Sequence, residues 1–148
     1  MKTVGWQTNL YKKAWLMSPK IYKDYKIYSC IVLNYLVSAL GINIYQANLE
    51  EKIDTILLTR RASVTKSEIM HEIKSNHHMT NKIIEKLKED GLITVKKGEK
   101  RFEIEITKKG VLHIRKYNQF YLELYKEQIL DHYRYRGLPS WARKLRMV

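Results

Sequence analysis

The chain has 148 residues, and its 28 lysine and arginine residues exceed its 15 aspartate and glutamate residues, giving a formal net charge of +13. This length suits one domain with short extensions and leaves little room for a large catalytic cleft. A hydrophobic content of 45% excludes a chain that is disordered throughout. The single cysteine, Cys30, excludes an intramolecular disulfide framework and a zinc site built from several thiolates. The excess of positive charge predicts a polyanionic partner, either nucleic acid or an anionic membrane surface.

Residues 27–49 contain no charged residue, so a membrane span is one interpretation of this stretch. Polar residues interrupt it, however, and five lysines between residues 12 and 26 would leave the basic remainder of the chain outside the cell. We therefore expect a buried core helix here and no membrane partner. The first seven residues also lack the apolar core of a secretory leader, so we expect a cytoplasmic, nucleoid-associated protein.

The N-terminal part, residues 1–48, is expected to be a helical extension that packs on the core or at a dimer interface. Ser18 and Pro19 form an N-cap followed by proline at the first helical position, and Gly41 is a favourable residue just beyond a helix end. Apolar residues recur at steps of three and four between these points, which predicts a helix up to Leu40. A strand over residues 27–33 is the alternative, because this stretch is rich in β-branched residues.

The middle part, residues 49–110, has three helical segments followed by a change of period. An apolar stripe predicts a short helix over residues 49–57, and residues 63–65 are expected to be extended. Thr65 and Glu68 fit a capping box at the start of a helix over residues 66–74, and a polar turn at 75–77 precedes a helix over residues 78–90. We expect Met79, Ile83, Ile84 and Leu87 on the buried face of that second helix, and Gly91 at its end.

The next segments alternate with the period of two that is typical of strands. Residues 92–95 and 101–106 predict the two strands of a hairpin, and the charged residues 96–100 predict its turn. The predicted fold class is therefore mainly α, within the α+β class: helices followed by a two-stranded β-hairpin, with a further helix at the C-terminal end.

Two short segments of this part resemble the winged helix-turn-helix superfamily. Residues Leu87 to Ile93 are similar to the L-x-x-x-G-L-I segment that ends the recognition helix, and residues Ile106 to Gly110 are similar to the I-T-x-x-G that follows the wing in MarR-, PadR- and related archaeal regulators. The resemblance covers roughly residues 49–135. It implies a protein that binds double-stranded DNA, most often as a dimeric transcriptional regulator.

In that fold the second helix of the pair enters the major groove and its polar residues contact base edges. The resemblance therefore implies DNA contacts for the polar face of the helix over residues 78–90, with Asn81 suited to adenine and His78 and Lys82 suited to guanine or phosphate. The basic hairpin would lie along phosphates or enter the minor groove. The candidate DNA-binding residues are His77, His78, Asn81, Lys82, Lys86, Lys96, Lys97, Lys100 and Arg101. A solvated helix face and a merely soluble hairpin are the alternatives, and Glu99, Glu103 and Glu105 argue against a hairpin that contacts nucleic acid along its whole length.

The C-terminal part, residues 111–148, is expected to hold a long helix from Lys108 to about Arg136, N-capped by Thr107. Ile114, Tyr117, Tyr121, Leu124 and Tyr125 form a seam with helical spacing, which the N-terminal helix or a second copy of the chain would cover. We favour a homodimer through the helix over residues 111–135 and the N-terminal helix, because a two-fold dimer matches pseudo-palindromic DNA. Tyrosines that stack on RNA bases are an alternative use of this stripe.

The tail after Gly137 is basic and predicts a last short helix containing Trp141 and Leu145. This tail could grip the DNA backbone, anchor on the core through Trp141, or do both. No phosphate-binding glycine loop, nucleophile elbow or pair of catalytic carboxylates is present in the sequence. His71, His77 and His78 do not have the spacing of a closed zinc site. We therefore expect no catalytic residues, no cofactor and no metal.

Overall fold

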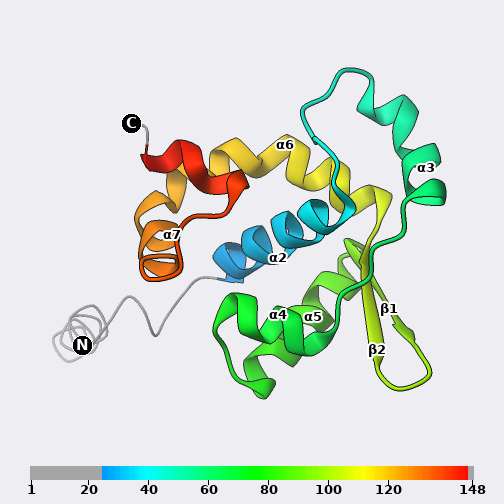
Figure 1. Ribbon diagram of the computed structural model, residues 1–148, viewed down its shortest axis with the longest axis horizontal. Helices are drawn as coiled ribbons and strands as arrows, with labels where there is room; N and C mark the ends of the chain where they lie inside the picture. Colours follow the sequence, from blue (N-terminus) through cyan, green and yellow to red (C-terminus); the bar gives the residue numbers. More distant parts are fainter. Residues whose placement is uncertain (1–24, 147–148) are drawn as a thin grey trace, which may run out of the picture.

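The computed structural model describes residues 25–146 (Figure 1). These residues form helices and one two-stranded antiparallel sheet. The elements in chain order are α2 (Tyr25–Leu40), α3 (Leu49–Thr59), α4 (Lys66–Ile73), α5 (His77–Glu89), β1 (Ile93–Lys97), β2 (Phe102–Ile106), α6 (Lys108–Leu124), α7 (Lys126–His132) and the 3-10 helix η1 (Ser140–Arg146). Within this range, none of the helices combines the length and the apolar content that a membrane crossing requires.

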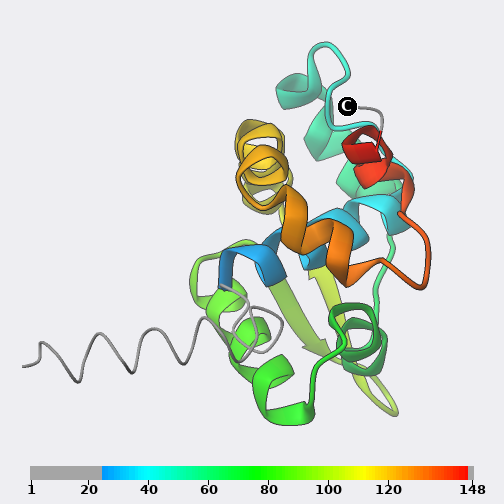
Figure 2. The same ribbon diagram turned by 90° about the vertical axis from the view of Figure 1, so that its left-hand side faces the viewer.

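Helix α2 is the centre of the molecule, with α6 on one side and α4, α5 and the hairpin on the other (Figures 1 and 2). The prediction of a helix ending at Leu40 is confirmed, and Gly41 follows it with φ 70°. The alternative prediction of a strand over residues 27–33 is wrong. These residues are buried within α2, and their packing on both sides of the helix outweighs the strand preference of their β-branched side chains. The predicted start at Ser18 and Pro19 lies outside the described residues. Cys30 is fully buried, and burial raises its thiol pKa to about 12.

The pair α4 and α5 is held by its caps. Thr65 forms the predicted capping box: its hydroxyl accepts from the Glu68 backbone N–H at 3.1 Å, and the Glu68 carboxylate accepts from the Thr65 N–H. Helix α4 ends one residue earlier than expected, because Lys74 adopts a left-handed conformation with φ 53°. Helix α5 begins one residue earlier than expected, because the Asn76 side chain accepts from the Met79 N–H at 2.8 Å.

The buried face of α5 differs from the prediction by one residue. Ile83, Ile84 and Leu87 are buried as expected, but Met79 is only half-buried. Thr80 takes the fourth position and has 0% of its surface exposed. Residues three or four positions apart share one face of a helix. Thr80 lies three residues before Ile83 and four before Ile84, so it shares their buried face.

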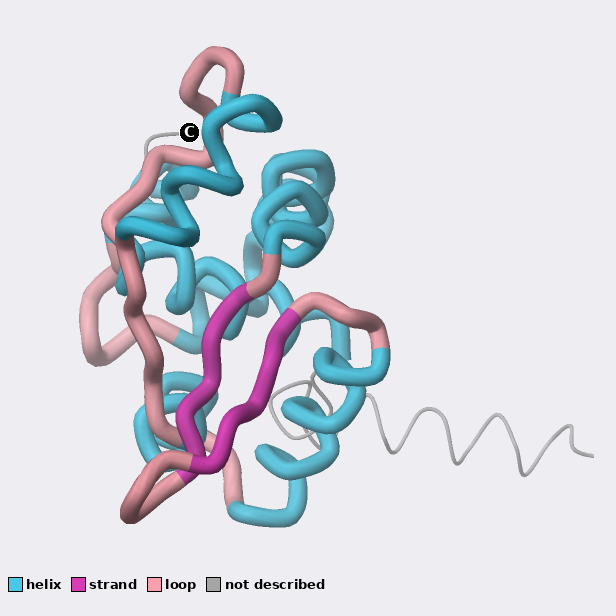
Figure 3. Tube along the Cα trace, turned by 90° about the vertical axis from the view of Figure 1, so that its right-hand side faces the viewer, coloured by secondary structure: helices cyan, strands magenta, loops and turns pink. Residues whose placement is uncertain are grey.

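The hairpin pairs Ile93 with Ile106 and Val95 with Ile104. Its turn is shorter than predicted, because Lys96 and Lys97 belong to β1, and the Gly98 N–H donates to the Arg101 carbonyl at 2.8 Å. Val64, in the extended link before α4, forms an isolated antiparallel bridge with Ile104 (Figure 3). The link therefore extends the sheet at the β2 edge.

The start of α6 is fixed against the end of α5. The Thr107 hydroxyl donates to the Gly91 carbonyl at 2.6 Å and accepts from the Gly110 N–H at 3.0 Å, so Thr107 is the N-cap as predicted. A Cβ on Gly110 would lie 2.2 Å from the Leu92 carbonyl oxygen, so only glycine allows this approach. The end of α5, the hairpin and the start of α6 are therefore joined at one point.

The single long helix expected between Lys108 and Arg136 is wrong. The helix breaks at Tyr125, whose φ of −110° and ψ of 22° are not helical, and α7 follows in a new direction (Figures 1 and 2). The break lets Ile129 and Tyr133 return to the core, where they are 0% and 2% exposed. The tail then turns back, and Trp141 packs edge-on against Tyr133 with 5.8 Å between ring centroids. The predicted anchoring of the tail on the core is confirmed for Trp141.

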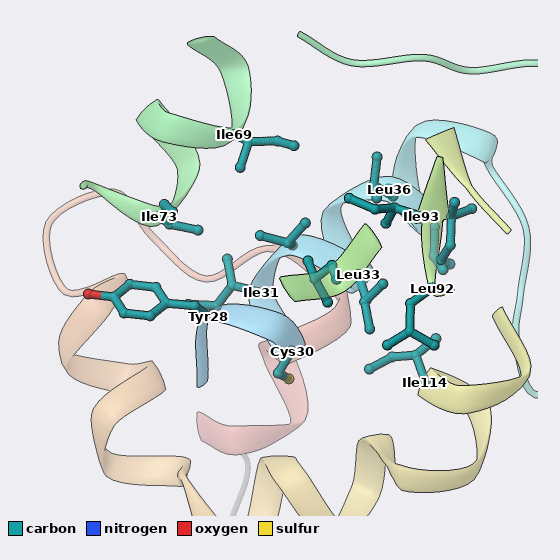
Figure 4. Close-up of a cluster of buried hydrophobic side chains, with 14 of the residues drawn as sticks. Tyr28, Cys30, Ile31, Leu33, Leu36, Ile69, Ile73, Leu92, Ile93 and Ile114 are labelled. Atoms are coloured by element: carbon teal, nitrogen blue, oxygen red, sulfur yellow. The ribbon is translucent and has the colours of Figure 1, made fainter. Parts of the chain in front are cut away.

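The predicted seam of α6 is also wrong in part. Ile114 is buried as expected, but the buried face continues through Asn118 and Leu122 and packs against α2. Tyr117 is 38% exposed and Leu124 is 55% exposed, so both lie on the outer face. Figure 4 shows the resulting core, with Ile69 and Ile73 of α4 on one side of α2 and Ile114 of α6 on the other.

Candidate nucleic-acid interface

The exposed face of α5 carries every polar residue that the sequence assigned to it. Successive residues are about 100° apart around a helix, so the residues opposite Thr80 and Leu87 point directly away from the core. These outermost residues are His78, Lys82, Glu85 and Glu89. Asn81 lies on the side of the hairpin, and His77 stands in the first turn. Lys86 lies on the opposite side and forms an ion pair of 3.7 Å with Asp90.

A pocket of about 290 Å³ separates α5 from the hairpin. Asn81, Glu85 and Lys88 of α5 line one wall, and Val95 and Phe102 line the other. Lys66, at the start of α4, and the apolar Ile84 and Ile104 complete the lining. The structure therefore brings Asn81 to the hairpin and adds three residues that the sequence reasoning did not select: Lys66, Lys88 and Phe102.

Phe102 is the most distinctive of these additions, because 54% of its surface is exposed although it begins a strand. It pairs across the hairpin with Lys97. The two therefore share the face of Val95 and Ile104, which is the face toward α5. The signal in the sequence that could have identified Phe102 is its place at the start of an alternating pattern. That pattern does not distinguish an exposed strand end from a buried one.

The four basic residues of the hairpin separate into two groups. Lys97 lies on the face toward α5, and Lys100 and Arg101 are exposed at the tip. Lys96 lies on the opposite face, where it is cross-strand from Glu103 and forms an ion pair of 3.8 Å with Glu105. The structure thus places Lys96 with the acidic residues, apart from the other three.

The resulting surface combines cations at its edge with hydrogen-bonding groups at its centre. Among the described residues, no acidic side chain forms an ion pair with Lys82, Lys97, Lys100 or Arg101. The charges of Lys86 and Lys96 are partly compensated, although exposed ion pairs contribute little energy. Such a surface can bind phosphates through its cations, and Asn81 and Glu85 can form hydrogen bonds to the polar edge of a planar ring.

A buried polar cluster, which the sequence reasoning missed, fixes α4 against the C-terminal part of the chain. The Glu72 carboxylate accepts from the Tyr133 hydroxyl at 2.6 Å and from the Arg136 guanidinium at 3.0 Å. The Glu72 carbonyl contacts the His132 ring at 2.7 Å. Burial, together with the Glu72 hydrogen bond, raises the Tyr133 pKa far above its usual value. The cluster therefore joins α4, which precedes α5, to the residues at the end of α7.

A metal centre has no support in the part of the chain that the structure describes, where no three His, Cys, Asp or Glu residues are close enough to hold an ion. His71, His77 and His78 therefore do not form such a group. In comparisons with known proteins, no family model matches this chain and no curated protein matches it.

Proposed function

We propose that this protein binds double-stranded DNA through a winged helix-turn-helix and acts as a homodimeric transcriptional regulator. The observation that carries the proposal is the shared surface of α5 and the hairpin: Asn81, Glu85 and Lys88 of α5 line one pocket with Val95 and Phe102 of the hairpin. The same hairpin carries the exposed cations Lys97, Lys100 and Arg101. A helix presents base-reading groups in the major groove, and a flanking basic hairpin follows the phosphates.

The local architecture supports the helix-turn-helix part of the proposal. Helices α4 and α5 are joined by only three residues, Lys74, Ser75 and Asn76, as is typical of the motif. The antiparallel hairpin follows α5 directly and takes the place of the wing. The net charge of +13 favours DNA of any sequence, since each phosphate neutralised releases condensed counterions.

Residues of α5 and β2 supply the means to distinguish base pairs. The Asn81 amide suits the adenine N6 and N7 edge, and the Glu85 carboxylate accepts from the cytosine amino group. The exposed Phe102 ring, which lines the same pocket, suits the thymine methyl group. The basic tip of the hairpin contributes affinity without sequence information.

The first test is a titration of labelled duplex DNA by fluorescence anisotropy at about 50 and 200 mM salt. We expect Lys97→Ala with Arg101→Ala to weaken binding at the lower salt and to reduce the salt slope by about two. The matched control, Lys52→Ala with Arg61→Ala, removes the same charge from exposed residues of α3 and of the segment that follows it, and should change binding much less. Equal loss in both double variants would contradict a hairpin interface. No binding by the unmodified protein at either salt concentration would exclude the DNA proposal and favour a protein partner for this surface.

Asn81→Ala tests sequence recognition separately from affinity. If the protein is a specific regulator, this variant should lose about 1–3 kcal/mol of discrimination between a selected site and random duplex. If the protein is instead a sequence-independent chromatin protein, Asn81→Ala should bind both duplexes as the unmodified protein does. Glu50→Ala on α3 is the control for a general effect of surface substitution.

The outer face of α6 supports the homodimer. Tyr117, Phe120 and Leu124 are 38%, 55% and 55% exposed, and they lie along one side of the helix at steps of three and four. The same helix has Lys116 before Phe120 and Glu123 after it. Two copies packed antiparallel about Phe120 would place these opposite charges near each other, as an isologous two-fold interface requires.

Phe120→Asp tests this interface, because it places a carboxylate at the centre of the apolar face. We expect a dimer for the unmodified protein and a monomer for the variant in sedimentation velocity, with weaker DNA binding by the variant. Leu58→Asp is the control, since Leu58 is 76% exposed on α3. A monomeric unmodified protein, or a dimer that survives Phe120→Asp, would contradict this interface.

A further inference from the structure

A second pocket, with a volume of about 480 Å³, lies on the side of α2 that faces α6. Four segments line it: α2, the residues after α2, α6 and η1. Figure 2 shows η1 in red beside the cyan segment that follows α2. Its size falls in the range of about 300–1,000 Å³ that is usual for small-molecule sites. It is separate from the pocket between α5 and the hairpin, and none of its lining residues belongs to the proposed DNA interface.

The floor of this pocket is a pair of buried amides. Asn34 and Asn118 are each 2% exposed, and the Asn34 amide nitrogen donates to the Asn118 carbonyl oxygen at 2.9 Å. The Asn118 amide nitrogen donates to the Tyr45 hydroxyl oxygen at 3.0 Å. The hydroxyl of Tyr45 can still donate its own hydrogen, for which the described residues provide no acceptor. The Tyr45 hydroxyl, which also lines the pocket, is therefore available as a donor to a ligand.

The walls of the pocket combine apolar side chains with polar ones, among them Ser38, Asn43 and Gln119, and its rim carries one positive charge. Val37, Ile44, Leu122 and Trp141 provide aliphatic and aromatic surface, and Lys144 is exposed at the rim. Small-molecule sites usually combine apolar surface with a few polar groups that fix the orientation of the ligand. The apolar side chains, the two buried amides and the single cation of this pocket form such a combination.

We propose that this pocket binds a small amphipathic organic anion. Its apolar, ring-sized body packs against Trp141 and Leu122, an acceptor atom receives the Tyr45 hydroxyl hydrogen, and its carboxylate or sulfonate group lies at Lys144. The proposal concerns the opposite side of α2 from the DNA-binding elements and does not depend on the proposed function.

The test uses the full chain and 1-anilinonaphthalene-8-sulfonate, a dye with aromatic rings and one sulfonate that fluoresces in apolar sites. We expect saturable binding of one dye molecule per chain. Ser38→Trp, at a residue that lines the pocket, should weaken binding at least about tenfold because the indole fills the space. Ala39→Trp, at the next residue of α2, which is exposed and does not line the pocket, should leave the affinity unchanged.

A second pair of variants tests the charge at the rim. Lys144→Gln should weaken the dye several-fold and Arg143→Gln should not, since Arg143 is exposed but does not line the pocket. Bound dye should also raise the melting temperature of the unmodified protein and not that of Ser38→Trp. Absence of dye binding, as expected if another part of this chain fills the pocket, would overturn the proposal. Equal affinities of Ser38→Trp and Ala39→Trp would also overturn it, because the dye would then bind elsewhere.

Discussion

The two sides of α2 have opposite chemical characters. On the side of α4, Ile31 packs among Ile69 and Ile73, and all three have 0% of their surface exposed (Figure 4). On the side of α6, the buried residues include Asn34, Asn118 and the thiol of Cys30, which form a hydrogen-bonded group beside the 480 Å³ pocket. One helix thus has a mainly apolar interface with α4, where the Tyr35 hydroxyl donates to the Glu68 carboxylate at 3.2 Å, and a partly polar interface with α6.

This contrast predicts which side of α2 is the more rigid. Apolar side chains that interdigitate lose dispersion contacts and hydration energy if they move, so the α4 side is held as one packed unit. A buried amide pair contributes less net stability than apolar side chains of the same shape, because its hydrogen bonds replace bonds to water. We therefore expect the α4 side of α2 to resist change more than the side with the pocket.

The largest expected effect comes from an apolar truncation on the α4 side. Ile31→Ala removes methyl groups from a site with no exposed surface and should lower the free energy of unfolding by about 2–5 kcal/mol. Urea denaturation followed by circular dichroism measures this loss. Leu58→Ala, at a residue that is 76% exposed, is the control and should change stability by less than about 0.5 kcal/mol. A loss below 1 kcal/mol for Ile31→Ala would mean that this side is not tightly packed.

On the α6 side, the loss of stability should depend on whether one or both of the paired amides Asn34 and Asn118 are replaced. The Asn34 amide nitrogen donates to the Asn118 carbonyl oxygen and to the Cys30 backbone carbonyl, each at 2.9 Å. Asn118→Leu removes the first of these acceptors and should cost about 1–3 kcal/mol. Replacing both residues, Asn34→Leu with Asn118→Leu, removes both polar groups and should be less destabilising than the single change. Urea denaturation of both single variants and the double variant gives the coupling energy. Additive losses in the double variant would contradict a coupled pair.

The elements around Gly91 and Gly110 could be predicted from sequence because their signals are local. A capping box, a glycine after a helix and alternating apolar residues each act within a few residues. The two segments that resemble winged-helix regulators also meet in space, where Thr107 bonds to the Gly91 carbonyl and Gly110 approaches Leu92. Whether the fold belongs to that superfamily stays a prediction, as does every DNA contact.

The C-terminal part was harder to predict because its conformation depends on contacts between distant residues. Nothing local to Tyr125 ends a helix; the break follows from the burial of Ile129 and Tyr133. Tyr117 and Leu124 have the spacing of a core stripe, yet Asn118 takes the buried position because Asn34, 84 residues earlier, pairs with it. Partners of that kind cannot be identified from one sequence, and neither can the pocket beside them.

The smallest expected effect concerns acid and the α6 side. His113 of α6 is half-buried and contacts the Tyr121 hydroxyl at 3.2 Å. Burial is the main cause that lowers its pKa; Lys109 lowers it further and Asp90 partly opposes the shift. Since the unfolded chain takes up this proton more readily, the contribution of His113 to stability is complete above its unfolded pKa of about 6.5 and falls as the pH drops toward its folded pKa. Between about pH 7 and 5, the free energy of unfolding should therefore decline less steeply in His113→Gln than in the unmodified protein. The difference between the two proteins should be smaller than the loss of stability caused by Asn118→Leu. Identical pH profiles for the two proteins would show that His113 does not titrate differently in the folded state.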